Sequence, residues 1–419
     1  MNAKTIAENA KKTAEALAQA GTEAKNAALR SMATRLQERK QDILAANGAD
    51  MKDAQDKGLE PNLVNRLRFG EAKIDGRVRC LGKIEALPDP VGQVFRSDLR
   101  PNGLQFMRVR EPLGVILMIF EARPHVTVNA GAFCLKSGNA AILRGGSEAK
   151  RCNTLLGDLW GEALREAGLP ETAVQVVTGS HEEIQELLQR SDCIDLVIPR
   201  GGKKLIEAVH RNSAIPVVKH FEGICHVYVD EGADREKALR IILDSKLLMP
   251  EVCNASETVL LHQANRDWIK PLVAELAARG VETRGCPVVL EEAPEAKPAT
   301  DEDWATEYLD TIYSIRVVED LSAAIAHLRQ YGSGHTDSIV TEDYARARRF
   351  VREAPSSVAL VNASTMFCDG ETMGMGAEIG ISTDKLHARG PMGLEELTTY
   401  KHVVFGDGQV MGEPHDWKR

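Results

Sequence analysis

Long hydrophobic runs and an excess of positive charge are both missing from this sequence of 419 residues. No stretch approaches the ~18 uncharged apolar residues of a membrane-spanning helix, and the N-terminus lacks the apolar core of a signal peptide. Lys and Arg total 52 against 61 Asp and Glu, which gives a formal net charge of −9. Nucleic-acid-binding proteins normally carry a basic patch, so this balance argues against that class. Hydrophobic residues make up 43%, which supports a sizeable core and excludes a disordered chain.

Several short motifs are missing as well. The sequence has no Gly-x-Gly-x-x-Gly fingerprint and no P-loop, so the usual signatures of nucleotide binding are lacking. It has no His-Glu-x-x-His and no Cys-x-x-Cys pair, so we expect no metal site. The eight Cys are spread along the chain, several of them within apolar runs. In a chain of this length they indicate reduced thiols in a cytoplasmic protein and not a disulfide framework.

The N-terminal part of the chain has a helical pattern. Apolar positions recur every three to four residues from 2 to about 59, with breaks expected at Gly21 and at Asn47-Gly48. A further helix is expected from about 62 to 84. Two alternating runs between 93 and 109 flank an Asn-Gly pair, which predicts a β-hairpin.

After Pro112 the pattern changes to strands that alternate with helices. The apolar run Gly114–Phe120 is typical of a strand buried on both faces. Similar runs alternate with helical stretches to about Val218, and a second series begins near His226. This spacing predicts βαβ units, parallel sheets and an α/β fold. The segment 362–393, rich in Gly, Ser and Thr, predicts a long loop with a function.

Two glycine-rich joints follow expected strands. They read Arg144-Gly145-Gly146-Ser147 and Arg200-Gly201-Gly202-Lys203. Each would place backbone N–H groups and a cation at a helix N-terminus, where a phosphate group can bind. Each could equally be an ordinary βα turn, in which Gly is common. Two joints of the same kind favour a nucleotide.

The eight thiols differ in their surroundings. Most read as core residues, and Cys225 is an unpromising partner for His226 because neighbours in a strand point to opposite faces. Cys368 lies in the Gly-rich loop, and we expect it to be exposed. Cys253 lies in a polar segment between a helix and the apolar run 258–261. A thiol at such a joint can face a cleft and have a lowered pKa, so Cys253 is the candidate nucleophile.

A set of short stretches together carries a family resemblance. In chain order they are Ile119-Phe-Glu-Ala-Arg-Pro124, Ile142-Leu-Arg-Gly-Gly146, Ile198-Pro-Arg-Gly-Gly202, Cys225-His-Val-Tyr-Val-Asp230, Cys253-Asn254, Glu257-Thr258, Glu307-Tyr308, Val361-Asn-Ala-Ser-Thr365, Gly376-Ala-Glu378 and Leu386-His-Ala-Arg-Gly-Pro-Met-Gly-Leu-Glu395. Over nearly its whole length the chain resembles the aldehyde dehydrogenase superfamily. Within it, the chain resembles the family of gamma-glutamyl phosphate reductases (glutamate-5-semialdehyde dehydrogenases).

The resemblance implies a reaction of proline biosynthesis. The family reduces L-glutamyl 5-phosphate with NADPH to L-glutamate 5-semialdehyde and phosphate. Cys253 matches the family nucleophile, which would form a thioacyl enzyme, and a thiolate is the best side-chain nucleophile near neutral pH. The backbone N–H of Cys253 or the side chain of Asn254 would stabilise the oxyanion.

The resemblance also implies how NADPH or NADP would be held. Arg144 stands where the superfamily has the Lys that binds the adenosine ribose. Ser147 stands where NAD-dependent relatives have an acidic residue, and this exchange suits a 2′-phosphate. Arg200, Gly201 and Gly202 match the loop near the pyrophosphate, and Gly145, which follows Arg144, is a further cofactor candidate. Glu307 matches the Glu that binds the nicotinamide ribose.

Two departures from the superfamily pattern concern the chemistry. Glu222 lies near the position of the water-activating Glu of hydrolytic relatives, but a phosphate-exchanging enzyme should exclude water, so we expect Glu222 not to be catalytic. The oxyanion Asn of those relatives would fall near Glu121 or Ala122 and is missing. Arg123, next to it, is a candidate for the substrate or its phosphate. Further substrate candidates are His335, Thr365 and Arg389, although a loop-stabilising role is an equal alternative for His335 and Arg389.

The implied fold is aldehyde dehydrogenase-like, with a Rossmann-type nucleotide domain. We expect the NADP(H)-binding domain at 1–92 and 110–225 and the catalytic domain at 226–365. A substrate and cofactor loop region would follow at 366–397. A β-flap at 93–109 and 398–415 would pair with a neighbouring subunit, giving a homodimer or homotetramer. Association with glutamate 5-kinase, which makes the unstable substrate, is a further hypothesis.

Two alternatives remain open on the sequence. A hydrolytic aldehyde dehydrogenase would act on a free aldehyde with NAD and would ignore phosphate. A non-catalytic protein that has kept the fold would be indifferent to loss of Cys253.

Overall fold

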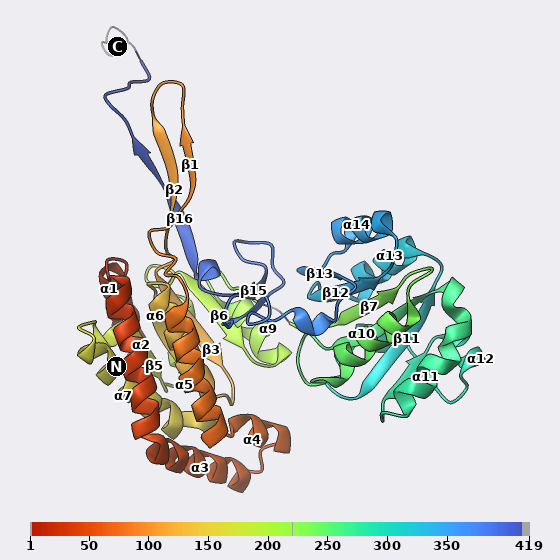
Figure 1. Ribbon diagram of the computed structural model, residues 1–419. Helices are drawn as coiled ribbons and strands as arrows, with labels where there is room; N and C mark the ends of the chain where they lie inside the picture. The colour runs from red at the N-terminus through yellow and green to blue at the C-terminus, as the bar shows by residue number, and fades with distance from the viewer. Residues whose placement is uncertain (1, 220, 413–419) are drawn as a thin grey trace. The chain divides into compact units, whose positions relative to one another are not determined.

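The computed structural model describes residues 2–219 and 221–412 (Figure 1). Its contacts divide the chain into two compact units. Unit 1 comprises the residues up to Gly201, the segment Ala208–Val217 and the residues from Gly393 on. Unit 2 comprises Gly202–Glu207 and Val218–Met392. Each unit is described by itself below.

The N-terminal segment of unit 1 is helical, as predicted, but the single helix expected from about 62 to 84 is divided into two. Its helices are α1 (Ala3–Leu17), α2 (Thr22–Glu38), α3 (Lys40–Asp56), α4 (Pro61–Leu67) and α5 (Glu71–Ala86). The break at Gly21 is confirmed, since Gly21 caps α2. The break at Asn47-Gly48 was wrong, because the buried Asn47 side chain donates to Leu67 O and accepts from Phe69 N, both at 2.8 Å. These bonds occupy the Asn amide, so it does not compete with the backbone of α3.

A parallel four-stranded sheet lies at the centre of unit 1, in the order β5-β4-β3-β6. All six residues of β3 are buried, as the apolar run predicted. Helices α1, α6 and α7 pack on this sheet. The strands are β3 (Val115–Phe120), β4 (Ala140–Gly145), β5 (Val174–Val177) and β6 (Leu196–Arg200), and the helices are α6 (His125–Lys136), α7 (Lys150–Glu166) and α8 (His181–Leu188). Helix α9 (Lys203–Asn212) is divided between the two units after Glu207.

The predicted hairpin is present in unit 1 and forms a long ribbon with the C-terminal strand (Figure 1). Strands β1 (Val94–Leu99) and β2 (Gln105–Pro112) pair antiparallel, and Gly103 in the turn has a φ of +87°. Strand β16 (Thr398–Phe405) pairs antiparallel with the other edge of β2. We call this three-stranded ribbon the flap. Residues 413–415, which the predicted flap included, lie outside the described residues.

Unit 2 contains a parallel seven-stranded sheet in the order β10-β9-β11-β8-β7-β12-β13. Its strands are β7 (Cys225–Val229), β8 (Ser256–His262), β9 (Glu282–Gly285), β10 (Lys297–Pro298), β11 (Ile312–Val318), β12 (Thr336–Val340) and β13 (Val358–Val361). Its helices are α10 (Arg235–Leu247), α11 (Ile269–Ala277), α12 (Pro287–Glu292), α13 (Leu321–Tyr331) and α14 (Tyr344–Glu353). The antiparallel strands β14 (Gly380–Ser382) and β15 (Gly390–Met392) complete the unit.

Helices cover both faces of this sheet. Val227 and Val229 of β7 share a buried cluster with residues of α10 and α11. Tyr228, between them, belongs to a second buried cluster with residues of α13 and α14. Alternate side chains of a strand point to opposite faces, so a strand buried on both sides is apolar throughout. The sequence prediction of two α/β series with parallel sheets is therefore confirmed.

The division into units differs from the expected domain limits at three places, the first of which is Gly202–Glu207, expected in the nucleotide domain but part of unit 2. The contacts place Val218 onward in unit 2, whereas the nucleotide domain was expected to extend to residue 225. They also place the segment from Gly393 in unit 1, whereas the loop region was expected to run to 397. Within the described chain no helix is long and apolar enough to cross a membrane. Nor do the described residues include a cluster of His, Cys, Asp or Glu side chains fit to hold a metal ion.

Candidate active site

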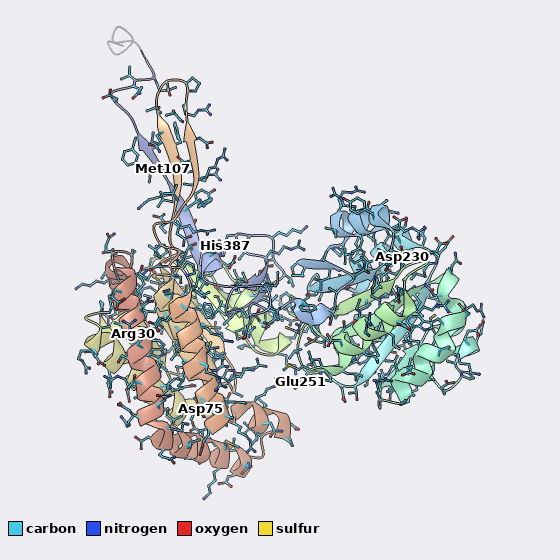
Figure 2. The ribbon with its side chains drawn as sticks, in the orientation of Figure 1. Arg30, Asp75, Met107, Asp230, Glu251 and His387 are labelled. Atoms are coloured by element: carbon cyan, nitrogen blue, oxygen red, sulfur yellow. The ribbon has the colours of Figure 1, made fainter. Side chains whose placement is uncertain are left out.

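The segment between α10 and β8 of unit 2 carries the candidate nucleophile. Glu251, labelled in Figure 2, lies in this segment two residues before Cys253. All eight thiols belong to described residues, and seven of them are buried, whereas Cys253 is partly exposed. Burial raises the pKa of the Cys134 thiol to about 12 and raises that of Cys225 well above its ordinary value. Cys253 is thus the thiol that a ligand can reach.

Cys368 does not lie where the sequence led us to expect. Its side chain is 1% exposed, and burial raises the pKa of its thiol to about 12, so the expected exposure was wrong. The cause is a polar link to the nucleophile segment. Asn254 Nδ2 donates to the carbonyl O of Met366 at 3.2 Å and to that of Cys368 at 3.1 Å. These two bonds hold the turn 366–368 against the residue that follows Cys253.

Cys225, the first residue of β7, contacts the backbone of Cys253. Cys225 Sγ donates to Cys253 O at 3.3 Å, and the same sulfur lies 3.6 Å from His335 Nδ1. His335 is fully buried and also lies 2.9 Å from Thr336 Oγ1. A ring that is closed off from solvent in this way favours the structural reading of His335 over a contact with a substrate phosphate.

Gly223 contacts both the backbone of Cys253 and the side chain of Glu307. Gly223 packs so closely on the nucleophile that a Cβ there would lie 1.9 Å from Cys253 O and 2.7 Å from Cys253 Cα. Gly223 N donates to Glu307 Oε1 at 2.9 Å. Because any side chain at residue 223 would displace the Cys253 backbone, this close approach requires glycine. It also connects Glu307, the candidate ligand of the nicotinamide ribose, to Cys253 through one residue.

A charge pair that sequence reasoning missed joins the two elements that flank the nucleophile segment. Lys246 Nζ is 2.5 Å from Glu257 Oε2, and both side chains are fully buried. The rings of Tyr308 and Tyr313 each lie 5.8 Å from Lys246 Nζ. Burial raises the pKa of the Glu257 carboxyl to about 7, although Lys246 acts in the opposite direction. The pair joins the end of α10 to the start of β8, on either side of Cys253.

Glu222 is engaged in an ion pair. Its Oε2 accepts from Lys203 Nζ at 2.8 Å. This bond gives the Glu222 carboxylate a partner within unit 2, and the role of Glu222 stays a prediction.

Two other substrate candidates lie in the loops of unit 2. Thr365 begins the turn held by Asn254, and its Oγ1 is buried with no hydrogen-bond partner among the described residues. Arg389 is exposed, and its guanidinium donates to Pro355 O, which fits the loop-stabilising alternative. The structure therefore brings Cys253, Asn254 and Thr365 together within unit 2, but not Arg389.

The cofactor candidates of unit 1 lie at the carboxyl end of its sheet. Arg144 of β4 pairs with Ile119, and Arg200 of β6 pairs with Phe120, so both flank the end of β3. Arg144 Nε is buried and has no hydrogen-bond partner in the part of the chain that the structure describes. The Nε–H can donate to a phosphate or ribose oxygen without losing an existing bond, which fits the nucleotide interpretation.

An acidic residue, Glu148, directly follows Ser147, the position at which NAD-dependent relatives carry an acid. Ser147 is exposed and lines a cavity of about 650 Å³ with residues of α3 and α7. Glu148 lines the same cavity, and its Oε1 accepts from Ala122 N at 2.6 Å. Ala122 has a φ of +27°, a conformation that L-residues rarely adopt. Glu148 thus holds the strained loop that precedes Arg123.

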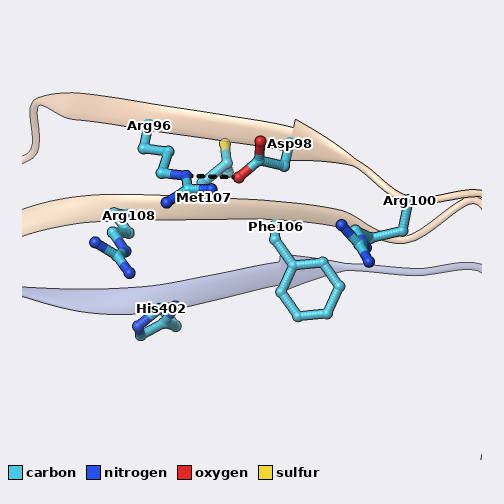
Figure 3. Close-up of a pocket in the computed structure, with 7 residues that line it drawn as sticks. All are labelled: Arg96, Asp98, Arg100, Phe106, Met107, Arg108 and His402. Carbon is cyan, nitrogen blue, oxygen red and sulfur yellow. Dashed lines mark hydrogen bonds and ion pairs between the residues drawn. The ribbon is translucent and has the colours of Figure 1, made fainter.

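A second hollow lies on the flap and contains none of the predicted site residues (Figure 3). It has a volume of about 290 Å³ and is lined by Arg96, Asp98, Arg100, Phe106, Met107, Arg108 and His402. Arg96 Nε donates to Asp98 Oδ2 at 2.8 Å, as the dashed line marks. The shallow groove has no nucleophile, so we do not assign catalysis to it.

Comparison with known proteins places the chain in a class. Residues 1–284 match the family model described as "Aldehyde dehydrogenase family". An acetylating aldehyde dehydrogenase from Geobacillus thermoglucosidasius shares the fold, with a TM-score of 0.70 at 18% identity over 98% of each chain. The chain therefore belongs to the aldehyde dehydrogenase family.

More similar relatives define its place within that family. A gamma-glutamyl phosphate reductase from Carboxydothermus hydrogenoformans is 49% identical over 97% of this chain and 99% of its own. One from Ruthia magnifica is 46% identical over 97% of both. The crystal structure of the Thermotoga maritima gamma-glutamyl phosphate reductase has a TM-score of 0.96 at 42% identity, covering 98% of this chain and 100% of that one. The chain belongs with the gamma-glutamyl phosphate reductases.

Proposed function

We propose that this chain reduces L-glutamyl 5-phosphate to L-glutamate 5-semialdehyde and phosphate through a thioester on Cys253, the second step of proline biosynthesis from glutamate. The observation that carries the proposal is the environment of the eight thiols. Seven are buried, while Cys253 is partly exposed at the joint between α10 and β8. The thiolate of Cys253 attacks the acyl carbon, and the bond from that carbon to the phosphate oxygen breaks, with phosphate leaving with the electron pair.

The thioester is then reduced at the same carbon. When NADPH is bound, it supplies the hydride that converts the thioester carbon into the aldehyde carbon. The oxygen carries negative charge in this step and needs hydrogen-bond donors. Of the two donors considered, the backbone N–H of Cys253 is the better one, because the Asn254 amide already donates to two carbonyls. The carbon–sulfur bond then breaks, and Cys253 returns to the thiolate.

Asn254 acts, in this proposal, as a positioning residue. Its two bonds fix the turn at Met366 and Cys368 relative to the nucleophile segment. Thr365, at the start of this turn, is the candidate for contact with the glutamyl head. Its buried Oγ1 has no partner among the described residues, so it can accept or donate a bond to a substrate without cost.

An enzyme of this family uses a nicotinamide cofactor, and we propose that it is NADPH. Arg144 would hold the 2′-phosphate, which agrees with its buried and unpartnered Nε. Ser147 carries no charge beside that group. Glu148 is the nearest carboxylate of the joint, but its Oε1 accepts from Ala122 N and so serves the loop before Arg123. Glu307, oriented by Gly223 N, would bind the nicotinamide ribose.

We further propose that the flap joins subunits into a homodimer or homotetramer. β1 and β16 are the two edges of the ribbon, and an edge strand with unpaired backbone groups can add a strand from another chain. Exposed apolar side chains lie on these strands, among them Val94, Phe95, Val404 and Phe405. Association with glutamate 5-kinase, which makes the unstable acyl phosphate, stays a hypothesis.

The test separates this function from hydrolytic aldehyde oxidation. Glutamate semialdehyde and NADP are supplied with and without phosphate or arsenate, and NADPH formation is followed. We expect sustained turnover only with the anion, because Cys253 then transfers its acyl group to phosphate. Turnover that ignores the anion would show a hydrolytic enzyme and would refute the proposal.

A further inference from the structure

The cavity of about 650 Å³ that Ser147 lines has no ligand assigned to it above. Its walls come from α3 and the residues that follow α3, from the joint after β4, and from the first half of α7. All of these lining residues belong to unit 1. The cavity therefore opens beside the joint at which the proposed function places the adenosine end of the cofactor.

A side chain from α3 already binds the backbone N–H groups at the start of α7. Asp50 is 2% exposed, and its carboxylate accepts from Arg151 N at 3.2 Å and from Cys152 N at 2.9 Å. The Arg151 guanidinium is held too, because it donates to Asp50 Oδ1 at 3.2 Å and to Asp53 Oδ2 at 2.7 Å. A helix N-terminus favours an anion, and at α7 Asp50 fills that place. Other groups must then meet the charge of an anionic ligand in this cavity.

Two lysines in the cavity wall supply such groups. Lys57 directly follows α3, and Lys150 is the first residue of α7. Both are exposed, and neither ammonium group has a hydrogen bond or an ion pair in the part of the chain that the structure describes. A lysine at the start of a helix adds to the positive end of the helix dipole, so an anion is favoured beside Lys150.

Helix α3 runs antiparallel to α7, which places both lysines at one end of the cavity. The charge of Asp158, in the middle of α7, acts on Arg39, the residue just before α3. Further along α3, Asp50 contacts the first turn of α7. Lys57 comes after the last residue of α3 and therefore lies toward the end of the cavity that Ser147 lines.

The carboxylates of the cavity wall do not oppose an anion at this end. The two acids of α3 are paired with Arg151. Glu148 Oε1 is turned to Ala122 N, from which it accepts at 2.6 Å. Asp158 lies eight residues after Lys150, which is about 12 Å along α7. The lysine end of the cavity is thus cationic, in a protein of net charge −9.

We propose that this end of the cavity receives the 2′-phosphate of the cofactor, and that Lys57 and Lys150 bind it together with Ser147 and Arg144. The inference rests on the proposed function, in which NADPH is the reductant. Lysine binds phosphate as a point charge, and the Ser147 hydroxyl can donate a hydrogen bond to it. NADH has a hydroxyl in place of this phosphate and gains nothing from either lysine, so both residues select for NADPH.

The test measures cofactor binding without turnover in the full-length chain. NADPH and NADH are titrated by their own fluorescence, and adenosine 2′,5′-bisphosphate is titrated by calorimetry. We expect Lys57→Gln and Lys150→Gln each to raise Kd for NADPH and for the bisphosphate about tenfold, as for loss of a charged hydrogen bond, with Kd for NADH within about twofold. Lys150→Arg should restore most of the affinity. The matched control is Lys52→Gln, because Lys52 is exposed on α3 and does not line the cavity.

Other outcomes overturn the proposal. An equal loss of affinity for NADPH and NADH would assign the lysines to another part of the cofactor. Unchanged affinity for NADPH in both lysine variants would remove them from the site, while the roles of Arg144 and Cys253 would still stand. If the lysine variants behave as expected but turnover of the semialdehyde with NADP ignores phosphate, the 2′-phosphate site survives and the proposed function fails.

Discussion

The buried pair Lys246–Glu257 allows a sharp prediction on stability. Lys246 Nζ lies 2.5 Å from Glu257 Oε2, and both side chains are fully buried. The substitution Lys246→Met therefore leaves the Glu257 carboxyl buried without its partner. Removing one partner of a buried pair leaves an uncompensated charge, which typically costs about 3–5 kcal/mol of the free energy of unfolding. Replacing both partners by apolar residues costs much less, because no charge is then buried.

The stability lost in Lys246→Met should depend on pH, and the Glu257 carboxyl determines in which direction. In the folded protein, burial raises the pKa of Glu257 from 4.5 to about 7. The folded state therefore holds this proton more tightly than the unfolded chain does. The resulting stabilisation is complete below pH 4.5 and is lost as the pH rises through 7, a change of about 3 kcal/mol. Loss of Lys246 raises the pKa of Glu257 further, so Lys246→Met should be most damaging at alkaline pH.

The assay is urea denaturation followed by tryptophan fluorescence, with Trp268 and Trp304 reporting on the core of unit 2. It compares the wild type, Lys246→Met and Lys246→Met/Glu257→Met at about pH 6 and about pH 8.5, on either side of the carboxyl transition. We expect the single variant to be the least stable, chiefly at the higher pH, and the double variant to recover most of the loss. Equal losses in both variants, or a loss that does not vary with pH, would refute the reasoning.

Three substitutions test the site itself. Gly223→Ala would place a Cβ 1.9 Å from Cys253 O. The displaced nucleophile should reduce kcat by about 100-fold or more. The control Gly48→Ala, at a position of α3 with open space around it, should leave kcat unchanged. Arg144→Glu should abolish the preference for NADPH over NADH in steady-state assays, and an intact preference would contradict the assignment of the 2′-phosphate. Asn254→Ala frees the carbonyls of two turn residues and should lower the free energy of unfolding by about 1–3 kcal/mol as well as kcat. A fall in kcat with unchanged stability would instead favour a direct oxyanion contact of Asn254.

The sequence was sufficient where periodicity or turn chemistry is local. The apolar run at 114–120 predicted a strand buried on both faces, and the Asn-Gly pair at Asn102-Gly103 predicted the hairpin. The same local signal misled at Asn47-Gly48, where a tertiary hydrogen bond to Phe69 N removes the tendency to turn. The short elements β9, α12 and β10 also escaped prediction, because segments of two to six residues carry little periodicity.

The candidate site was predicted in part. The position of Cys253 at a helix–strand joint follows from the pattern of elements. The burial of Cys368 does not, because it depends on a hydrogen bond to Asn254, 114 residues away along the chain. No sequence motif indicates that Lys246 pairs with Glu257, because one residue lies at the end of a helix and the other at the start of a strand.

The measurement that tests the account most directly is a single-turnover experiment on the thioester. Enzyme, NADP and glutamate semialdehyde are mixed without phosphate, and NADPH and the mass of the tryptic peptides are recorded. The account predicts a burst of one NADPH per chain, a glutamyl adduct on the peptide of Cys253, and renewed turnover when phosphate is added. The variant Cys253→Ala should show neither burst nor adduct while still binding NADPH. Steady turnover without phosphate, or an adduct on any of the other seven thiols, would contradict the account.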